Sequence, residues 1–162
     1  MSVRLFQHGS PVALPAALLL ALTMPASAAA NFFLGNWTID KAVVAPWADP
    51  PSKPDDAEMK SLVGKTVTFK AKQILAPGTL ACKALKYEVV EGDAEMLFQG
   101  GLAEKPDGTK LDADKRAHDL GFQGSSWKTL QTGCENELDF HFVDENTAEF
   151  GLNNYVYVLK RK

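Results

Sequence analysis

The sequence predicts an all-β fold: an eight-stranded antiparallel meander barrel with one or two short helices. From Phe33 onward, apolar residues alternate with polar ones at a period of two, which is typical of strands with one buried face. Turn-forming residues separate these segments, and the chain contains 12 Gly and 9 Pro. Eight strands in roughly 130 residues are enough to close a barrel and remove exposed sheet edges. The expected strands are residues 33–40, 65–71, 80–90, 95–99, 126–132, 137–143, 148–152 and 155–161.

The N-terminal segment has the features of a secretory signal peptide. Arg4 precedes a mostly apolar run over residues 12–22, and the small residues of Ala26-Ser27-Ala28 match a cleavage site. The run is shorter than the roughly 20 residues that a membrane-spanning helix needs. We therefore expect residues 1–28 to be a signal peptide, residues 29–162 to form one domain without a membrane anchor, and the protein to be periplasmic or secreted.

In the first half of the chain, the strands are separated by a long connection. Residues 45–54 are too rich in Pro to sustain a sheet ladder. Residues 55–62 begin with acidic side chains, which the helix dipole favours, and are expected to form one or two helical turns. Within residues 80–90 the alternation changes phase, which predicts a bulge near Ala84.

In the second half, a helix interrupts the strands. Lys105-Pro106-Asp107-Gly108 suits a type I turn. Asp112 can cap a helix over residues 113–120, whose apolar face includes Ala117 and which Gly121 would end. The last three strands are joined by tight hairpins, and Asn153-Asn154 tolerates the positive φ angles of a two-residue turn.

The two cysteines, Cys82 and Cys134, both lie after the expected signal peptide. An even number of cysteines in an exported chain is most simply explained by a disulfide. The spacing lacks the Cys-x-x-Cys pattern of redox enzymes, and two thiols supply too few ligands for a structural zinc site. We expect a structural disulfide.

One end of the expected barrel resembles a known family. Gly35-Asn36-Trp37 in the first strand, the long connection after it, and Arg161 near the end of the last strand resemble the lipocalins and the wider calycin superfamily. The resemblance implies a lipocalin-like barrel in which Trp37 packs under Arg161 and closes one end. A guanidinium stacked on an indole is physically favourable. The candidate closure residues are therefore Gly35, Trp37 and Arg161.

Aromatic residues are the candidate ligand-binding set. Trp47 lies in the long connection, where it is expected either to act as a lid at the barrel mouth or to anchor the loop by burying its ring. The inward-facing rings could line a cavity or fill it, since small eight-stranded barrels do either. The candidates are Trp47, Phe69, Tyr87, Phe140, Phe142, Tyr155 and Tyr157.

Few side chains indicate catalysis or metal binding. Asp139 and His141 share the outward face of a strand and could hold a metal if a third ligand approached, but a solvated outer face explains them more simply. His118 falls on the polar side of the predicted helix. Ser125 and Ser126 lack the Gly-x-Ser-x-Gly pattern of a hydrolase. We expect no catalytic residues, no metal and no cofactor.

The charge balance limits the partners. Residues 1–28 hold one Arg and no acidic residue, so their removal would change the formal charge from −3 to −4. A mildly acidic chain is not suited to nucleic acid, which needs a cationic face. The leading hypothesis is a non-catalytic binding protein with a small apolar or amphipathic ligand in or at the mouth of the barrel. The alternative is a periplasmic interaction protein, such as an inhibitor of lysozyme or another hydrolase, acting on a protein partner through exposed loops; an enzyme is the weakest possibility.

Overall fold

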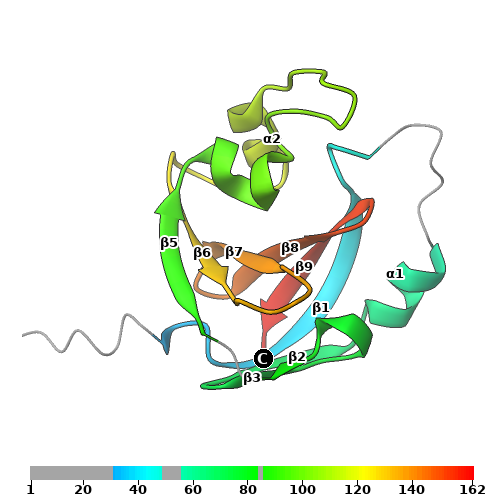
Figure 1. Cartoon of the computed structure of the whole chain (residues 1–162), viewed down its shortest axis with the longest axis vertical. Helices are drawn as coiled ribbons and strands as arrows, with labels where there is room; N and C mark the ends of the chain where they lie inside the picture. Colours follow the sequence, from blue (N-terminus) through cyan, green and yellow to red (C-terminus); the bar gives the residue numbers. More distant parts are fainter. Residues whose placement is uncertain (1–30, 49–55, 84–85) are drawn as a thin grey trace, which may run out of the picture.

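A single antiparallel sheet of nine strands organises the chain (Figure 1). The computed structural model describes residues 31–48, 56–83 and 86–162. The expected signal peptide, residues 49–55 of the long connection and the expected bulge at Ala84 therefore lie outside the described residues. The strands are β1 (Gly35–Val44), β2 (Thr66–Lys70), β3 (Gln73–Leu75), β4 (Cys82–Lys83), β5 (Glu88–Gly92), β6 (Trp127–Gln131), β7 (Asp139–Asp144), β8 (Thr147–Leu152) and β9 (Tyr155–Arg161).

The sheet forms a curled half-barrel, which corrects the expected closed barrel of eight strands. Its order is β4-β3-β2-β1-β9-β8-β7-β6-β5, so that β4 and β5 lie at its two ends. The predicted third strand, residues 80–90, is in fact two strands at these opposite ends. The short β3, which pairs with both β2 and β4, was not predicted from the sequence. A mostly β fold with few short helices is confirmed, and its curled shape is compatible with a lipocalin-like barrel.

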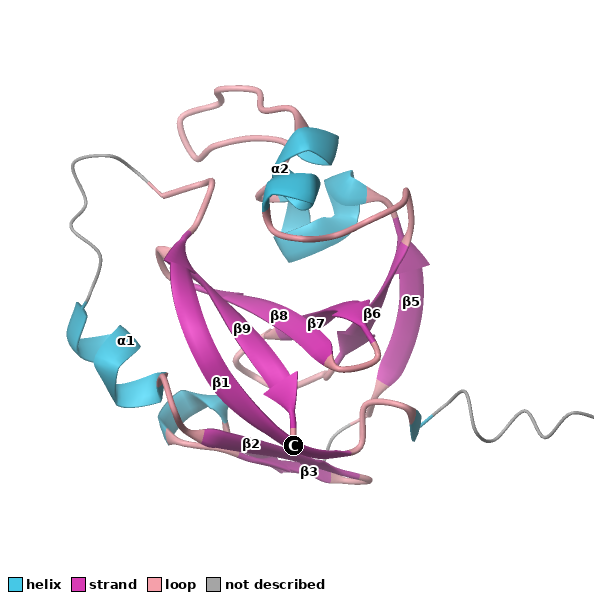
Figure 2. Ribbon diagram, turned by 180° about the vertical axis from the view of Figure 1, so that it is seen from behind, coloured by secondary structure: helices cyan, strands magenta, loops and turns pink. Residues whose placement is uncertain are grey.

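The central strands lie between two covers. In both ribbon views β2 and β3 lie on one side of β6–β9, and α2 (Ala113–Asp119) lies on the other (Figures 1 and 2). Two hydrophobic clusters correspond to these two sides. Because side chains alternate along a strand, neighbouring residues of β7 enter different clusters: Phe140 and Phe142 pack in the first, and Val143 in the second.

Packed aromatic rings fill the first cluster, which occupies the concave side. The Phe69 ring meets Phe140 edge to face at 4.8 Å between centroids, Phe140 meets Phe150 at 5.3 Å, and Phe150 stacks on Tyr157 at 5.0 Å. All four side chains are buried. Ring pairs in this range pack as a solid core, so the aromatic interior is filled by the protein's own side chains.

Short helices cover the opposite face. The predicted helix at residues 113–120 is confirmed as α2, with the Asp112 carboxylate accepting the Lys115 N–H. Residues 95–99, expected as a strand, instead belong to the 3₁₀ segment η3 (Ala94–Gly100). Asp93 starts η3 by accepting the Glu95 N–H, and this cap competes with strand formation. The helix α1 (Asp56–Leu62) agrees with the predicted helical turns, and η2 (Gly78–Leu80) precedes β4.

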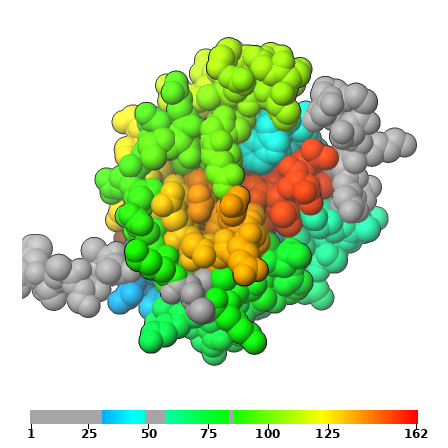
Figure 3. All heavy atoms as spheres, viewed as in Figure 1, coloured from blue at the N-terminus to red at the C-terminus, as the bar shows by residue number. Residues whose placement is uncertain are grey.

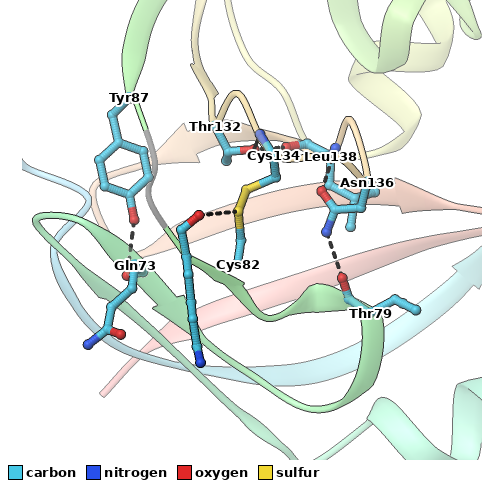
Figure 4. Close-up of a disulfide and its surroundings, with 9 residues drawn as sticks. Gln73, Thr79, Cys82, Tyr87, Thr132, Cys134, Asn136 and Leu138 are labelled. Atoms are coloured by element: carbon cyan, nitrogen blue, oxygen red, sulfur yellow. Dashed lines mark hydrogen bonds between the residues drawn. A yellow bond between two sulfur atoms is a disulfide. The ribbon is translucent and has the colours of Figure 1, made fainter.

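Cross-links hold the two ends of the curled sheet together (Figure 4). The predicted disulfide between Cys82 and Cys134 is present, and it joins β4 to the loop that follows β6. In the same region the Asn136 side-chain amide donates to the Thr79 carbonyl at 2.6 Å. The Tyr87 hydroxyl donates to the Gln73 carbonyl at 3.4 Å. Among the described residues, the two ends of the sheet are therefore joined by side chains and not by a ladder between β4 and β5.

The predicted contact between Trp37 and Arg161 is also present. Trp37 is 0% exposed, and the Arg161 guanidinium lies 4.2 Å from the centroid of its ring. Arg161 donates hydrogen bonds to the backbone carbonyls of Leu34 and Phe32, while the Trp37 indole donates to Phe33. A cation on an aromatic face whose N–H groups are also satisfied is a stable closure for an apolar core.

Among the described residues, no helix is both long and apolar enough to cross a membrane.

Candidate functional site

A pocket of about 290 Å³ is lined partly by residues of the outer face, such as His141 and Gly151, and partly by Leu138 and Leu152, which belong to or pack against the first cluster. We call it the Trp47 pocket. Its walls come from η3, from the loop between β6 and β7, from the β8–β9 turn and from the segment after β1. These segments meet on one face of the molecule, where green, orange, red and cyan atoms adjoin (Figure 3). The lining residues are Trp47, Phe98, Gln99, Asn136, Glu137, Leu138, Asp139, His141, Gly151, Leu152 and Asn153.

Unusual backbone conformations are concentrated at this pocket. Four non-glycine residues within the described ranges have positive φ: Phe98 (50°), Gln99 (55°), Glu137 (54°) and Asn153 (50°). All four line the Trp47 pocket. A left-handed conformation is costly for a residue with a side chain, especially an aromatic one, and such residues gather at ligand-binding and active sites.

Two glycines make room for Trp47. A Cβ atom at Gly101 would lie 2.8 Å from Cε3 of the Trp47 ring, and one at Gly151 would lie 3.0 Å from its Cη2 and Cζ2 atoms. The indole N–H donates to the Asn153 carbonyl at 2.9 Å, and the ring lies 5.4 Å from that of Phe98. Trp47 therefore anchors its loop and also forms a wall of the pocket.

The position of Trp47 separates the two roles expected for it. Gly151 alternates with the inward-facing Phe150 on β8, so the side chain that packs on Gly151 lies on the outer face. The contacts agree with a loop anchor. They place the ring away from the filled interior, so a lid function over that interior gains no support from them.

A buried polar row runs beneath η3 from the floor of the pocket. Thr129 on β6, His141 on β7 and Glu149 on β8 are cross-strand neighbours. His141 is 1% exposed, which corrects the expected solvated face. Its Nε2 atom accepts the Phe98 N–H at 3.0 Å, so the ring proton lies on Nδ1, which is 2.8 Å from the Thr129 hydroxyl. Burial lowers the pKa of His141 to about 3 and keeps the ring neutral.

Glu149 is the least satisfied member of the row. It is 2% exposed, and its Oε2 atom has no hydrogen-bond partner among the described residues. Burial raises the pKa of Glu149 to about 8, although the charges of Lys41 and Lys160 oppose the shift. At neutral pH this carboxyl is therefore mostly protonated and uncharged.

The charged side chains in the lining are acidic. Glu137 is exposed, whereas Asp139 is partly buried at the start of β7. Burial raises the pKa of Asp139. The salt bridges among the described residues do not include Asp139 or Glu137. Asp139 is thus partly desolvated without a cation that would offset the cost.

The remaining candidates from the sequence lie elsewhere. Phe69, Phe140 and Tyr157 are packed in the interior, and Tyr155 is buried with them. Tyr87 contacts Phe33, and Phe142 contacts Phe32 and Trp37. Of the predicted ligand-binding set, Trp47 lines the Trp47 pocket. His118 is exposed as expected.

Sequence patterns missed most of this site. The alternation of apolar and polar residues predicted that Asp139 and His141 point away from the interior. It did not predict that η3 covers His141, because residues 95–99 were interpreted as a strand. The described residues contain no group of three or more His, Cys, Asp or Glu side chains that could hold a metal ion.

Comparisons with known protein families, with curated proteins and with solved structures found no match for this chain.

Proposed function

We propose that the protein is an exported, non-catalytic binding protein, and that its small amphipathic ligand lies in the Trp47 pocket rather than among the interior aromatic rings. The observation that carries this proposal is that Phe98, Gln99 and Glu137, the left-handed non-glycine residues that the β8–β9 hairpin turn at Asn153 does not account for, all line the pocket. Such conformations persist where the surrounding structure fixes them and where a precise shape is needed.

The composition of the pocket supports an amphipathic ligand. Trp47, Phe98 and Leu152 offer apolar surface, while Asn136 and Asp139 offer polar groups that can fix an orientation. A site with apolar walls and a few polar groups is typical for small molecules. Its volume of about 290 Å³ suits a ligand at the small end of the range.

Membership of the calycin superfamily is a second part of the proposal. The curled antiparallel sheet supports it, as does the stacking of Arg161 on Trp37. The disulfide supports export, because disulfides persist in oxidising compartments.

Fluorescence titration tests the proposal. Fatty acids, isoprenoids and aromatic compounds would be titrated against the protein while tryptophan emission is recorded. Because Trp37 and Trp127 also emit, a Trp47→Phe variant assigns the signal. We expect at least one class of probe to change the Trp47 emission. Gly151→Ala, which adds a methyl group against the Trp47 ring, should weaken binding while the protein remains folded.

Trp127→Phe is the matched control, because Trp127 lies outside the Trp47 pocket and should leave the affinity unchanged. If no probe binds, or if binding is insensitive to Gly151→Ala and sensitive to Trp127→Phe, the pocket is not the ligand site.

A protein partner is the alternative function, and the filled interior favours it. The end strand β5 is one further observation in its support, since it lies at an end of the sheet order and end strands can pair with another chain. Val89 on β5 and Met96 on η3 are exposed apolar residues near this edge. A periplasmic inhibitor of a hydrolase would use such a surface. Failure of all small probes, together with capture of a purified hydrolase, would favour this alternative.

A further inference from the structure

We infer that the Trp47 pocket selects ligands with a cationic ammonium group, an inference that rests on the proposed binding function and names the chemical class of its ligand. Three features of the pocket point to this class: the acidic charge of its lining, a carboxylate without a salt bridge, and its aromatic walls.

The first step is the charge inside the pocket. The ionisable side chains of the lining are Glu137, Asp139 and His141, with no Lys or Arg among the lining residues. The neutral His141 ring adds no positive charge, because Nε2 accepts the Phe98 N–H. The field of the pocket is therefore negative, which disfavours carboxylate ligands such as fatty acids.

The second step is the unmatched carboxylate. Asp139 is partly buried, and no salt bridge among the described residues reaches it. Such a carboxylate gains from any cation that enters beside it. A small neutral ligand would leave the desolvation cost of Asp139 in place, whereas an ammonium group would offset part of it.

The third step is the aromatic surface. Trp47 and Phe98 lie next to each other with ring centroids 5.4 Å apart and an interplanar angle of 41°, and both line the pocket. Aromatic walls attract cations through the negative faces of their rings, with Trp the strongest. Two rings together with two carboxylates match an ammonium group attached to a small apolar body.

An ammonium group can belong to a free amine or to a lysine of a protein partner. Both share the chemistry that the pocket recognises. The test therefore compares benzylammonium with its neutral analogue benzyl alcohol, and adds Nα-acetyl-lysine methylamide as the lysine arm. Affinities would be measured by isothermal titration calorimetry at pH 7 and low ionic strength, with ¹⁵N–¹H NMR to locate each probe.

We expect benzylammonium to bind about tenfold more tightly than benzyl alcohol. Added salt should reduce this difference, because screening weakens the attraction to exposed charge. Asp139→Asn should remove most of the preference by weakening the binding of benzylammonium. Asp144→Asn, an exposed position on the same strand outside the Trp47 pocket, is the matched control. Glu137→Gln is a second test should Asp139→Asn fail to fold.

The outcomes separate the two proposals. If both benzyl probes bind in the pocket with equal affinity, or if the alcohol binds better, the cation preference is wrong and the binding function stands. If none of the three probes binds while a probe of the fluorescence titration does, the cation preference is wrong and the binding function stands; if no probe of either set binds, both are refuted. Binding of the lysine analogue as tightly as benzylammonium would assign the ammonium to a protein partner, and binding of benzylammonium alone would assign it to a free amine.

Discussion

Replacing Glu149 by Gln should change the pH dependence of stability between about pH 4.5 and pH 8. Burial raises the pKa of Glu149 from 4.5 to about 8. In the unfolded chain this carboxyl ionises near pH 4.5, whereas the folded protein retains the proton. The folded state therefore binds more protons between these two values, and the free energy of unfolding falls as pH rises from about 4.5 to about 8.

The magnitude follows from the size of the shift. Each pKa unit corresponds to about 1.4 kcal/mol. The cost of keeping Glu149 in the folded state is therefore small near pH 4.5 and reaches about 3 kcal/mol at pH 7. Between pH 5 and pH 9, the free energy of unfolding of the wild type should fall by about 4 kcal/mol more than that of Glu149→Gln, because Gln has nearly the same shape and does not ionise.

Denaturant unfolding followed by fluorescence or circular dichroism at several pH values measures this difference. The comparison cancels groups that titrate equally in both proteins, including His141. Glu145→Gln is the matched control, because Glu145 is exposed in the β7–β8 turn and should leave the profile unchanged. Parallel stability profiles for wild type and Glu149→Gln would refute the reasoning and would mean that the carboxyl has solvent or a partner that offsets its burial.

Two further predictions concern how the curled sheet is held together. Trp37→Ala should lower the free energy of unfolding by about 3–5 kcal/mol through lost packing, and Arg161→Ala by less; unchanged denaturant midpoints for both would remove the support for a calycin-like closure. Cys82→Ser, or reduction of the disulfide, should lower the free energy of unfolding by about 4 kcal/mol in the chain-entropy model, as measured by denaturant unfolding. The mass of the oxidised protein should increase by two hydrogens on reduction. Free thiols in exported protein would contradict the disulfide.

The local features of the fold were predictable because they depend on neighbouring residues. The alternation in β7 placed Phe140 and Phe142 on one face and His141 on the other, as the structure has them. The Asp112 cap predicted α2, since a carboxylate at that position satisfies a free helical N–H. The cysteine pair was predictable because two cysteines allow a single intramolecular pairing.

Long-range features were not predictable in the same way. Alternation shows which face a side chain occupies, but not what covers that face, and so His141 was expected in solvent. Residues 95–99 are apolar enough for a strand, and the Asp93 cap that starts η3 carries little weight in a pattern search. The division of residues 80–90 between the two ends of the sheet depends on tertiary pairing, which local propensity does not encode.

The buried row and the Trp47 pocket depend on the same backbone segment. His141 accepts the N–H of Phe98, a residue in the left-handed region, and the Gln99 side chain donates to the Glu137 carbonyl across the pocket. A left-handed conformation costs a non-glycine residue about 1–3 kcal/mol. The two hydrogen bonds help to hold these residues in that conformation. A neutral His141 is required because a protonated ring has no free acceptor for Phe98. The burial that lowers the pKa of His141 therefore also preserves the shape of the Trp47 pocket, and through this conformation the polar row contributes to the proposed binding site.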